Sequence, residues 1–73
     1  MDTLKIALRI RAFRKLKGLT QLELAERMGV SVSVLGSLER GTRKVDGKLI
    51  RRIAEVLDVK EEELLDVGQE RRA

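Results

Sequence analysis

Apolar residues recur every three to four positions at the start of the chain. In the stretch TLKIALRIRAFRKLKG, Ile6, Ile10 and Phe13 follow helical spacing. Leu16 lies close to the same stripe. Spacing of this kind is typical of an amphipathic helix with one buried face. Gly18 follows two nearby lysines, a combination typical of the end of a helix, so the pattern predicts a first helix that stops there.

The next stretch, TQLELAERMG, contains a start signal and a stop signal for a second helix. Thr20 is followed three residues later by Glu23, which is the spacing of a capping box. Gly29 stands where the helix would end. The residues predicted to face inward are Leu24, Ala25 and Met28.

The segment MGVSVSVLGSLERG admits two interpretations. Three valines alternate with two serines over residues 30–34, as in a half-buried strand. No other segment alternates in this way, so a strand here would leave its backbone groups unpaired. As a helix, the segment begins after Ser31 and ends at Gly41. The inward face of that helix consists of Val34, Leu35 and Leu38. We predict the helix, although Gly36 destabilises it by about 1 kcal/mol relative to alanine.

Two further helices complete the predicted fold. Asp46 can cap a fourth helix, and the glutamates at 61–63 suit the first turn of a fifth, where the helix dipole favours negative charge. The inward residues of these two helices are Ile50, Ile53, Ala54, Leu57, Leu64 and Leu65. The sequence therefore predicts an all-α domain of five helices over residues 1–66, followed by a short polar tail over residues 67–73.

Charge is distributed unevenly along the chain. The 73 residues carry a net charge of +4. Residues 1–52 hold 13 Lys or Arg against 5 Asp or Glu, a balance of +8, whereas residues 53–73 hold 3 against 7, a balance of −4. A basic field such as that of the first part attracts polyanions, including nucleic acid.

The chain lacks the side chains on which many enzymes and metal sites depend. It contains no Cys and no His, and so has neither a thiolate nor an imidazole for catalysis or metal binding. We therefore expect no enzymatic activity, no cofactor and no bound metal. No apolar run approaches the roughly 20 residues of a membrane span. We expect a cytoplasmic protein without membrane contact, associated with the nucleoid when bound to DNA.

The second and third predicted helices are joined by a link, MGVS, that is too short for antiparallel packing. The small Ala25 and a turn at Gly29 suit two helices that cross steeply, as in a helix-turn-helix (HTH). Between Ile10 and Leu65, the runs FRKLKGLTQLELAERMGVS, LERG and IAEVLDVKEEELL resemble the HTH repressors of the phage Cro and lambda-repressor type, also called XRE-type. The resemblance implies a compact lambda-repressor-like domain with a central HTH.

The resemblance also implies roles for individual residues. The third helix, from about Val32 to Arg40, would be the recognition helix in the major groove. The side chains implied to face the bases are Val32, Ser33 and Ser37. Those implied to contact DNA phosphates are Gln21, Arg43, Lys44 and Lys48. Arg14 and Glu39 match a pair that forms a buried salt bridge between the first and third helices of the family.

The base-facing set offers little discrimination between bases. Val32 presents only methyl groups, and the two serines form hydrogen bonds without strong preference. A bidentate contact from Arg, Gln or Asn would give about 1–3 kcal/mol of discrimination, and this set contains none of them. DNA shape and additional arms are alternative sources of specificity, and low specificity is the third alternative.

The main hypothesis is a DNA-binding transcriptional regulator, a repressor that binds double-stranded operator DNA as a homodimer. The half-sites would lie about 34–36 Å apart. A separate regulatory protein is a further candidate partner. Two alternatives use the same fold: an adaptor that docks a protein on the VSVSVLGS face, and an antitoxin-like module whose partner supplies dimerisation. Leu22 stands where the family usually has a polar, exposed residue, and Leu4 and Leu8 lie off the main stripe of the first helix. Exposed on one side, these residues would form a contact for a partner chain.

Overall fold

Five helices make up the part of the chain that the structure describes, residues 3–65 of a computed structural model. They are α1 (Thr3–Leu16), α2 (Gln21–Met28), α3 (Val32–Arg40), α4 (Gly47–Leu57) and α5 (Glu61–Leu65). No strand occurs over residues 3–65, so the all-α prediction is confirmed and the strand interpretation of residues 30–34 is wrong. The predicted tail, residues 67–73, lies outside the described residues.

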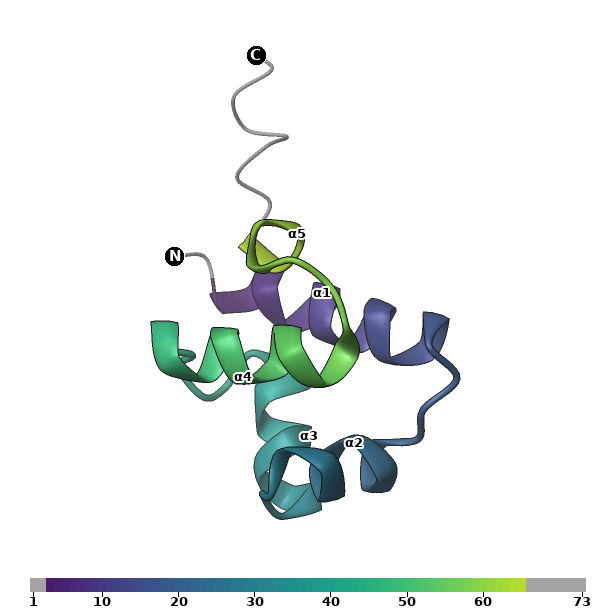
Figure 1. Cartoon of the computed structure of the whole chain (residues 1–73). Helices are drawn as coiled ribbons and strands as arrows, with labels where there is room; N and C mark the ends of the chain where they lie inside the picture. The colour runs from purple at the N-terminus through teal and green to yellow at the C-terminus, as the bar shows by residue number, and fades with distance from the viewer. Residues whose placement is uncertain (1–2, 66–73) are drawn as a thin grey trace.

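The helices form two groups in space. Figure 1 shows α2 and α3 together on one side of the molecule, with α1 and α4 above them and α5 beyond α1 and α4. α3 packs against both α2 and α1, α2 also packs against α4, and α5 packs against α1 and α4. Within this described part, no helix has the length and apolar composition needed to cross a membrane.

The predicted helix starts are confirmed by their hydrogen bonds. The Thr20 hydroxyl accepts from the Glu23 amide at 3.0 Å, and a Glu23 carboxylate oxygen accepts from the Thr20 amide at 2.8 Å, which completes the capping box. These contacts with Thr20 hold the pKa of Glu23 below its ordinary value. Ser31 caps α3 through the Val34 amide, and Asp46 caps α4 through the Leu49 amide.

The helix ends combine predicted and unpredicted features. Gly29 and Gly41 adopt left-handed backbone conformations, with φ of 75° and 77°, and end α2 and α3 as predicted. A Cβ atom at Gly41 would also lie 3.2 Å from the Leu4 side chain, because α1 passes close to the end of α3. The end of α4 was not predicted: Asp58 takes the left-handed conformation there, with φ of 59°.

The core is aliphatic and draws on all five helices. Its largest fully buried side chains are Ile10, Leu24, Leu35, Leu38, Ile50, Ile53, Leu57 and Leu64. Each of these contributes about 1.5–3 kcal/mol through removal of apolar surface from water. Val34 and Leu65, predicted to face inward, are only partly buried. The placement of Leu16 on the buried stripe is wrong, because this last residue of α1 extends past the core and is 74% exposed.

Candidate nucleic-acid interface

The turn between α2 and α3 is short and well defined. Gly29 turns the backbone at the end of α2, and the Val30 amide donates to the Ala25 carbonyl at 3.0 Å. Ser31 then caps α3 at once, so only three residues separate the two helices. Ala25 is buried, and its small side chain allows α3 to pack closely on α2. This arrangement is the helix-turn-helix that the sequence predicts.

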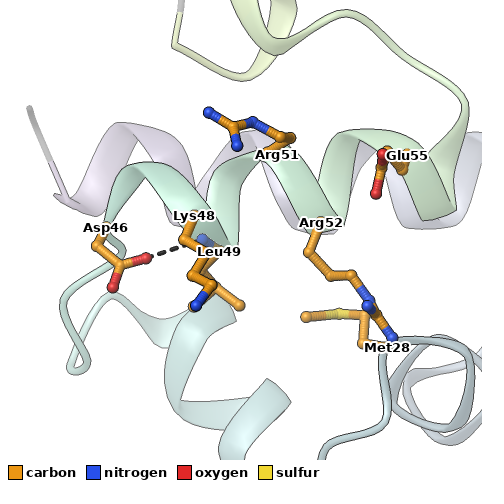
Figure 2. A pocket seen from close by; sticks show the side chains of 7 residues that line it. All are labelled: Met28, Asp46, Lys48, Leu49, Arg51, Arg52 and Glu55. Atoms are coloured by element: carbon orange, nitrogen blue, oxygen red, sulfur yellow. Dashed lines mark hydrogen bonds between the residues drawn. The ribbon is translucent and has the colours of Figure 1, made fainter.

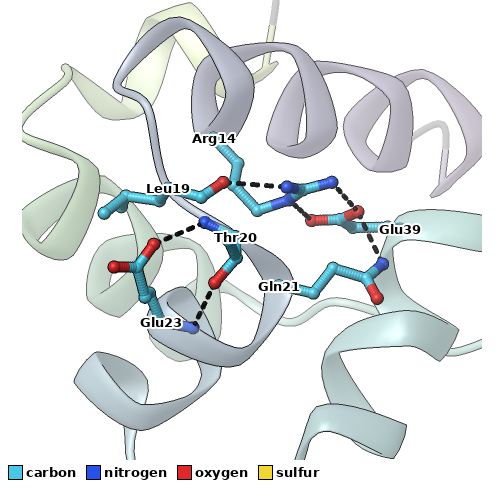
Figure 3. A network of polar contacts seen from close by, with 6 residues as sticks. All are labelled: Arg14, Leu19, Thr20, Gln21, Glu23 and Glu39. Atoms are coloured by element: carbon cyan, nitrogen blue, oxygen red, sulfur yellow. Dashed lines mark hydrogen bonds and ion pairs between the residues drawn. The ribbon is translucent and has the colours of Figure 1, made fainter.

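A buried ion pair joins α1 to α3 beneath the HTH (Figure 3). Arg14 Nε lies 2.6 Å from Glu39 Oε2, and Arg14 Nη2 lies 3.1 Å from Glu39 Oε1. The guanidinium also donates through Nη1 to the Leu19 carbonyl at 2.9 Å. The two side chains are only 10% and 3% exposed. Because the contact is bidentate, it fixes the rotation of α3 about its axis as well as its distance from α1.

Gln21 connects this buried pair to the start of α2. Its side-chain amide nitrogen donates to Glu39 Oε1 at 3.0 Å, which gives this carboxylate a third hydrogen bond. Gln21 is the first residue of α2 and is half-buried, so part of the side chain remains accessible. Figure 3 shows it reaching from α2 toward the carboxylate on α3. The residue predicted to contact a phosphate is therefore held in place by the residues predicted to pair.

The outward face of α3, which we define as Val32, Ser33, Gly36, Ser37 and Arg40, consists mainly of small residues. These positions follow helical spacing on the side of α3 opposite its buried leucines. The three residues predicted to face bases all lie on it. Val32 is 44% exposed, Ser33 is exposed and Ser37 is half-buried. Arg40 completes the face, and its Nη2 donates to the Ser37 hydroxyl at 3.4 Å.

The predicted phosphate-contacting cations follow α3 in the chain and are not part of its outward face. Arg43 and Lys44 are exposed in the loop that leads from α3 to α4, and Lys48 is exposed in the first turn of α4. The structure brings all three into the segment that directly follows the outward face of α3. Long cationic side chains in such a position suit contact with a phosphate backbone, which requires charge more than fixed geometry.

Two more arginines lie near Lys48, around an open hollow between α4 and the end of α2 (Figure 2). The hollow is lined by Met28, Asp46, Lys48, Leu49, Arg51, Arg52 and Glu55. Arg52 extends toward Met28, whereas Arg51 points to the other side of α4, where its Nε lies 3.8 Å from a Glu61 carboxylate oxygen. Sequence reasoning missed Arg52, although it follows Lys48 at the four-residue spacing that places both on one helix face.

The sequence of this chain is similar to those of known helix-turn-helix proteins. The helix-turn-helix family matches residues 10–64. The uncharacterized HTH-type transcriptional regulator YazB of Bacillus subtilis is 52% identical over 56 residues, which cover 77% of this chain and 81% of YazB. The HTH-type transcriptional regulator SinR of the same organism is 39% identical over 66 residues, which cover 89% of this chain and 60% of SinR.

Solved structures agree with the sequence relatives. The restriction-modification controller protein C.AhdI of Aeromonas hydrophila has a TM-score of 0.81 and 40% identity, over 86% of this chain and 96% of C.AhdI. The clp gene regulator ClgR of Corynebacterium glutamicum has a TM-score of 0.87 and 30% identity, over 100% of this chain and 95% of the ClgR chain. The fold and the sequence motif thus lead to the same group of proteins.

Proposed function

Because the chain belongs to the helix-turn-helix family of the Cro and lambda-repressor type, we propose that it regulates transcription by binding operator DNA through the outward face of α3. The observation that carries the proposal is the way in which α3 is held. Its inward side is fixed by buried leucines and the Arg14–Glu39 pair, while its outward side presents Val32, Ser33 and Arg40 to solvent. A rigidly held helix with an accessible face is what insertion into a major groove requires.

The remaining polar residues contact the DNA backbone on either side of this face. Gln21 contacts a phosphate on one side of the groove, supported by the backbone amides at the start of α2. Arg43, Lys44 and Lys48 contact phosphates on the other side. The base-facing residues Val32, Ser33 and Ser37 lie between these two groups, where the groove floor would be. Exposure of the cations and the short link to α3 support this assignment.

We propose further that the protein acts as a repressor and binds as a homodimer. A single module of this size buries about 600–1,000 Å² on DNA, which is small for tight specific binding. Two copies on half-sites about 34–36 Å apart would double the contact area and make the operator palindromic. No enzymatic step is part of this proposal, since DNA occupancy alone can block transcription.

The salt dependence of binding to random-sequence duplex tests the phosphate assignment. We expect single variants Arg43→Ala and Lys44→Ala each to reduce the slope of log affinity against log salt by about 0.9. The control is Lys60→Ala, which removes an exposed cation from the connection between α4 and α5 and should leave the slope unchanged. Absence of duplex binding at about 50 mM salt, or equal slopes for all three variants, would favour a protein-binding adaptor instead.

A further inference from the structure

Gly36 lies in the middle of α3, where glycine destabilises a helix relative to alanine. Its backbone is helical, so no unusual φ accounts for its presence. A side chain there would meet the Arg40 guanidinium. A Cβ atom at this position would lie 3.1 Å from Arg40 Nη1 and 4.0 Å from Arg40 Cζ, and no other such neighbour lies within 4 Å. Gly36 therefore leaves open the space that the Arg40 guanidinium occupies.

The Arg40 guanidinium is also held by a hydrogen bond within α3. Arg40 is the last residue of α3, and its side chain runs back along the helix until Nη2 donates to the Ser37 hydroxyl at 3.4 Å. Helical side chains lean toward the preceding turn, so this direction is the natural one. The positive charge consequently lies over the middle of the outward face of α3, next to Ser37 and not beyond the end of the helix.

The charge of Arg40 is not used for folding. Arg40 is exposed, and within residues 3–65 it makes no ion pair with a carboxylate. Its neutral partner Ser37 engages one of five guanidinium N–H groups and leaves the others accessible. A planar fork of donors at this place suits the guanine edge in the major groove, whose O6 and N7 atoms accept two parallel hydrogen bonds.

We propose that Arg40, positioned by Gly36 and Ser37, reads a guanine and is the main specificity determinant of α3. The proposal rests on the proposed DNA-binding function and deepens it. It changes the role of Ser37, which orients the guanidinium instead of reading a base by itself. Arg40 also supplies the bidentate donor that Val32, Ser33 and Ser37 lack. The base-reading group of α3 thus comes from its last residue, whose side chain folds back over the middle of the helix.

The test is selection of bound duplexes from a random pool by the full chain and its variants. We expect the wild type to select a guanine at one position of each half-site, and Arg40→Ala to lower the preference for it by about 5- to 150-fold. Arg40→Lys is the charge-matched control. It should keep the affinity for random duplex but weaken the guanine preference, because the lysine ammonium lacks the planar fork of donors.

Gly36→Ala separates a recognition role from a structural one. The added methyl group should raise the Tm by about 4–8 °C, since alanine favours the helix, while it shifts the close-lying guanidinium and weakens the guanine preference. A merely structural arginine would not give higher stability together with lower specificity.

The outcomes distinguish this proposal from the one on which it rests. If wild-type protein binds no duplex, both proposals fail. If it binds, but the Arg40 variants lower affinity equally for all sequences, the guanidinium contacts a phosphate and only the guanine assignment is overturned. A selected consensus that Arg40→Ala leaves unchanged would overturn it as well.

Discussion

The two faces of α3 contrast within a helix of only nine residues. The inward face carries Leu35, Leu38 and Glu39, all buried, and the carboxylate accepts three hydrogen bonds from α1 and α2. The outward face of α3 is built mainly of small residues, and its one long side chain, Arg40, donates a hydrogen bond to Ser37 of the same helix. Contacts with the rest of the fold are therefore concentrated on one side.

This difference separates stability from recognition. Substitutions on the inward face should lower the free energy of unfolding, and should affect DNA binding only because less protein is folded. Substitutions of the exposed side chains on the outward face should change DNA binding and leave folding nearly unaltered, since they remove few buried contacts. Gly36 is the exception, because it is buried beneath Arg40 and its replacement by alanine favours the helix.

Among substitutions on the inward face, Glu39→Gln should lower the free energy of unfolding the most. The change leaves the Arg14 guanidinium buried without a countercharge, and removing one partner of a buried pair costs roughly 3–5 kcal/mol. A domain of this length has a total stability of about 4–11 kcal/mol, so the loss should be a large part of it. Urea denaturation measures the effect.

Glu26→Gln provides the matched control for this variant, because it makes the same chemical change at an exposed position of α2. It should alter the free energy of unfolding by less than about 0.5 kcal/mol. Equal urea midpoints for the two variants would show that the buried pair does not hold α3 in place.

A second pair of substitutions tests how closely α3 must approach α1. Gly41→Ala forces alanine into a left-handed conformation, at a cost of about 1–2 kcal/mol, and also brings a methyl group to 3.2 Å from the Leu4 side chain. Gly18→Ala has a similar φ of 76° but no neighbouring atom within 4 Å. Thermal unfolding should show a greater loss for Gly41→Ala. Identical losses would mean that the conformation alone matters and that the Leu4 contact adds nothing.

Gln21 belongs to both sides of this comparison. It donates a hydrogen bond to the buried Glu39 carboxylate, and we also propose that it contacts a DNA phosphate. Gln21→Ala removes the hydrogen bond to Glu39, which should lower the free energy of unfolding by about 1 kcal/mol. Duplex affinity, measured where the variant is fully folded, should fall by about fivefold through loss of the phosphate contact. Leu22→Ala, an exposed change at the next residue, should do neither. A stability loss with unchanged affinity would assign Gln21 to the fold alone.

The sequence alone was sufficient for features that depend on neighbouring residues. The caps at Thr20, Ser31 and Asp46, and the glycine ends of α2 and α3, involve atoms only a few residues apart, so local chemistry predicts them. Contacts between residues far apart in the sequence could not be predicted from local chemistry. Arg14 and Glu39 are 25 positions apart, and only resemblance to a family suggested their pairing.

Other features could not be predicted because they depend on three-dimensional arrangement. The folded-back position of Arg40 depends on a side-chain conformation and on the space above Gly36, neither of which hydrophobic spacing reveals. Leu16 has the spacing of a core residue, but the end of α1 extends beyond the core against which the helix packs. A periodic pattern predicts which side of a helix faces inward, and it does not predict where the neighbouring helices end.

The smallest effect should come from the helix starts, which differ between α2 and α3. α2 begins with a capping box completed by the Glu23 carboxylate, whereas α3 is capped by the Ser31 hydroxyl, which does not titrate. The pKa of Glu23 lies below its ordinary value of 4.5 because the folded state stabilises the ionised form. The ionised carboxylate thus stabilises the fold fully above pH 4.5, and this stabilisation is lost as the pH falls through the lower, folded-state pKa.

Thermal unfolding of Glu23→Gln across pH should reveal that dependence. The Tm of the variant should lie slightly below that of the wild type at pH 6, and the two should converge as the pH falls below 4.5 and through the lowered folded-state pKa of Glu23. The difference should be small because the carboxylate is exposed and screened by salt. Ser31→Ala is the comparison variant, and its loss of about 1 kcal/mol should stay constant over the same range. A pH-independent difference for Glu23→Gln would mean that the carboxylate acts as a hydrogen-bond acceptor whose charge is irrelevant, and that the two helix starts work alike.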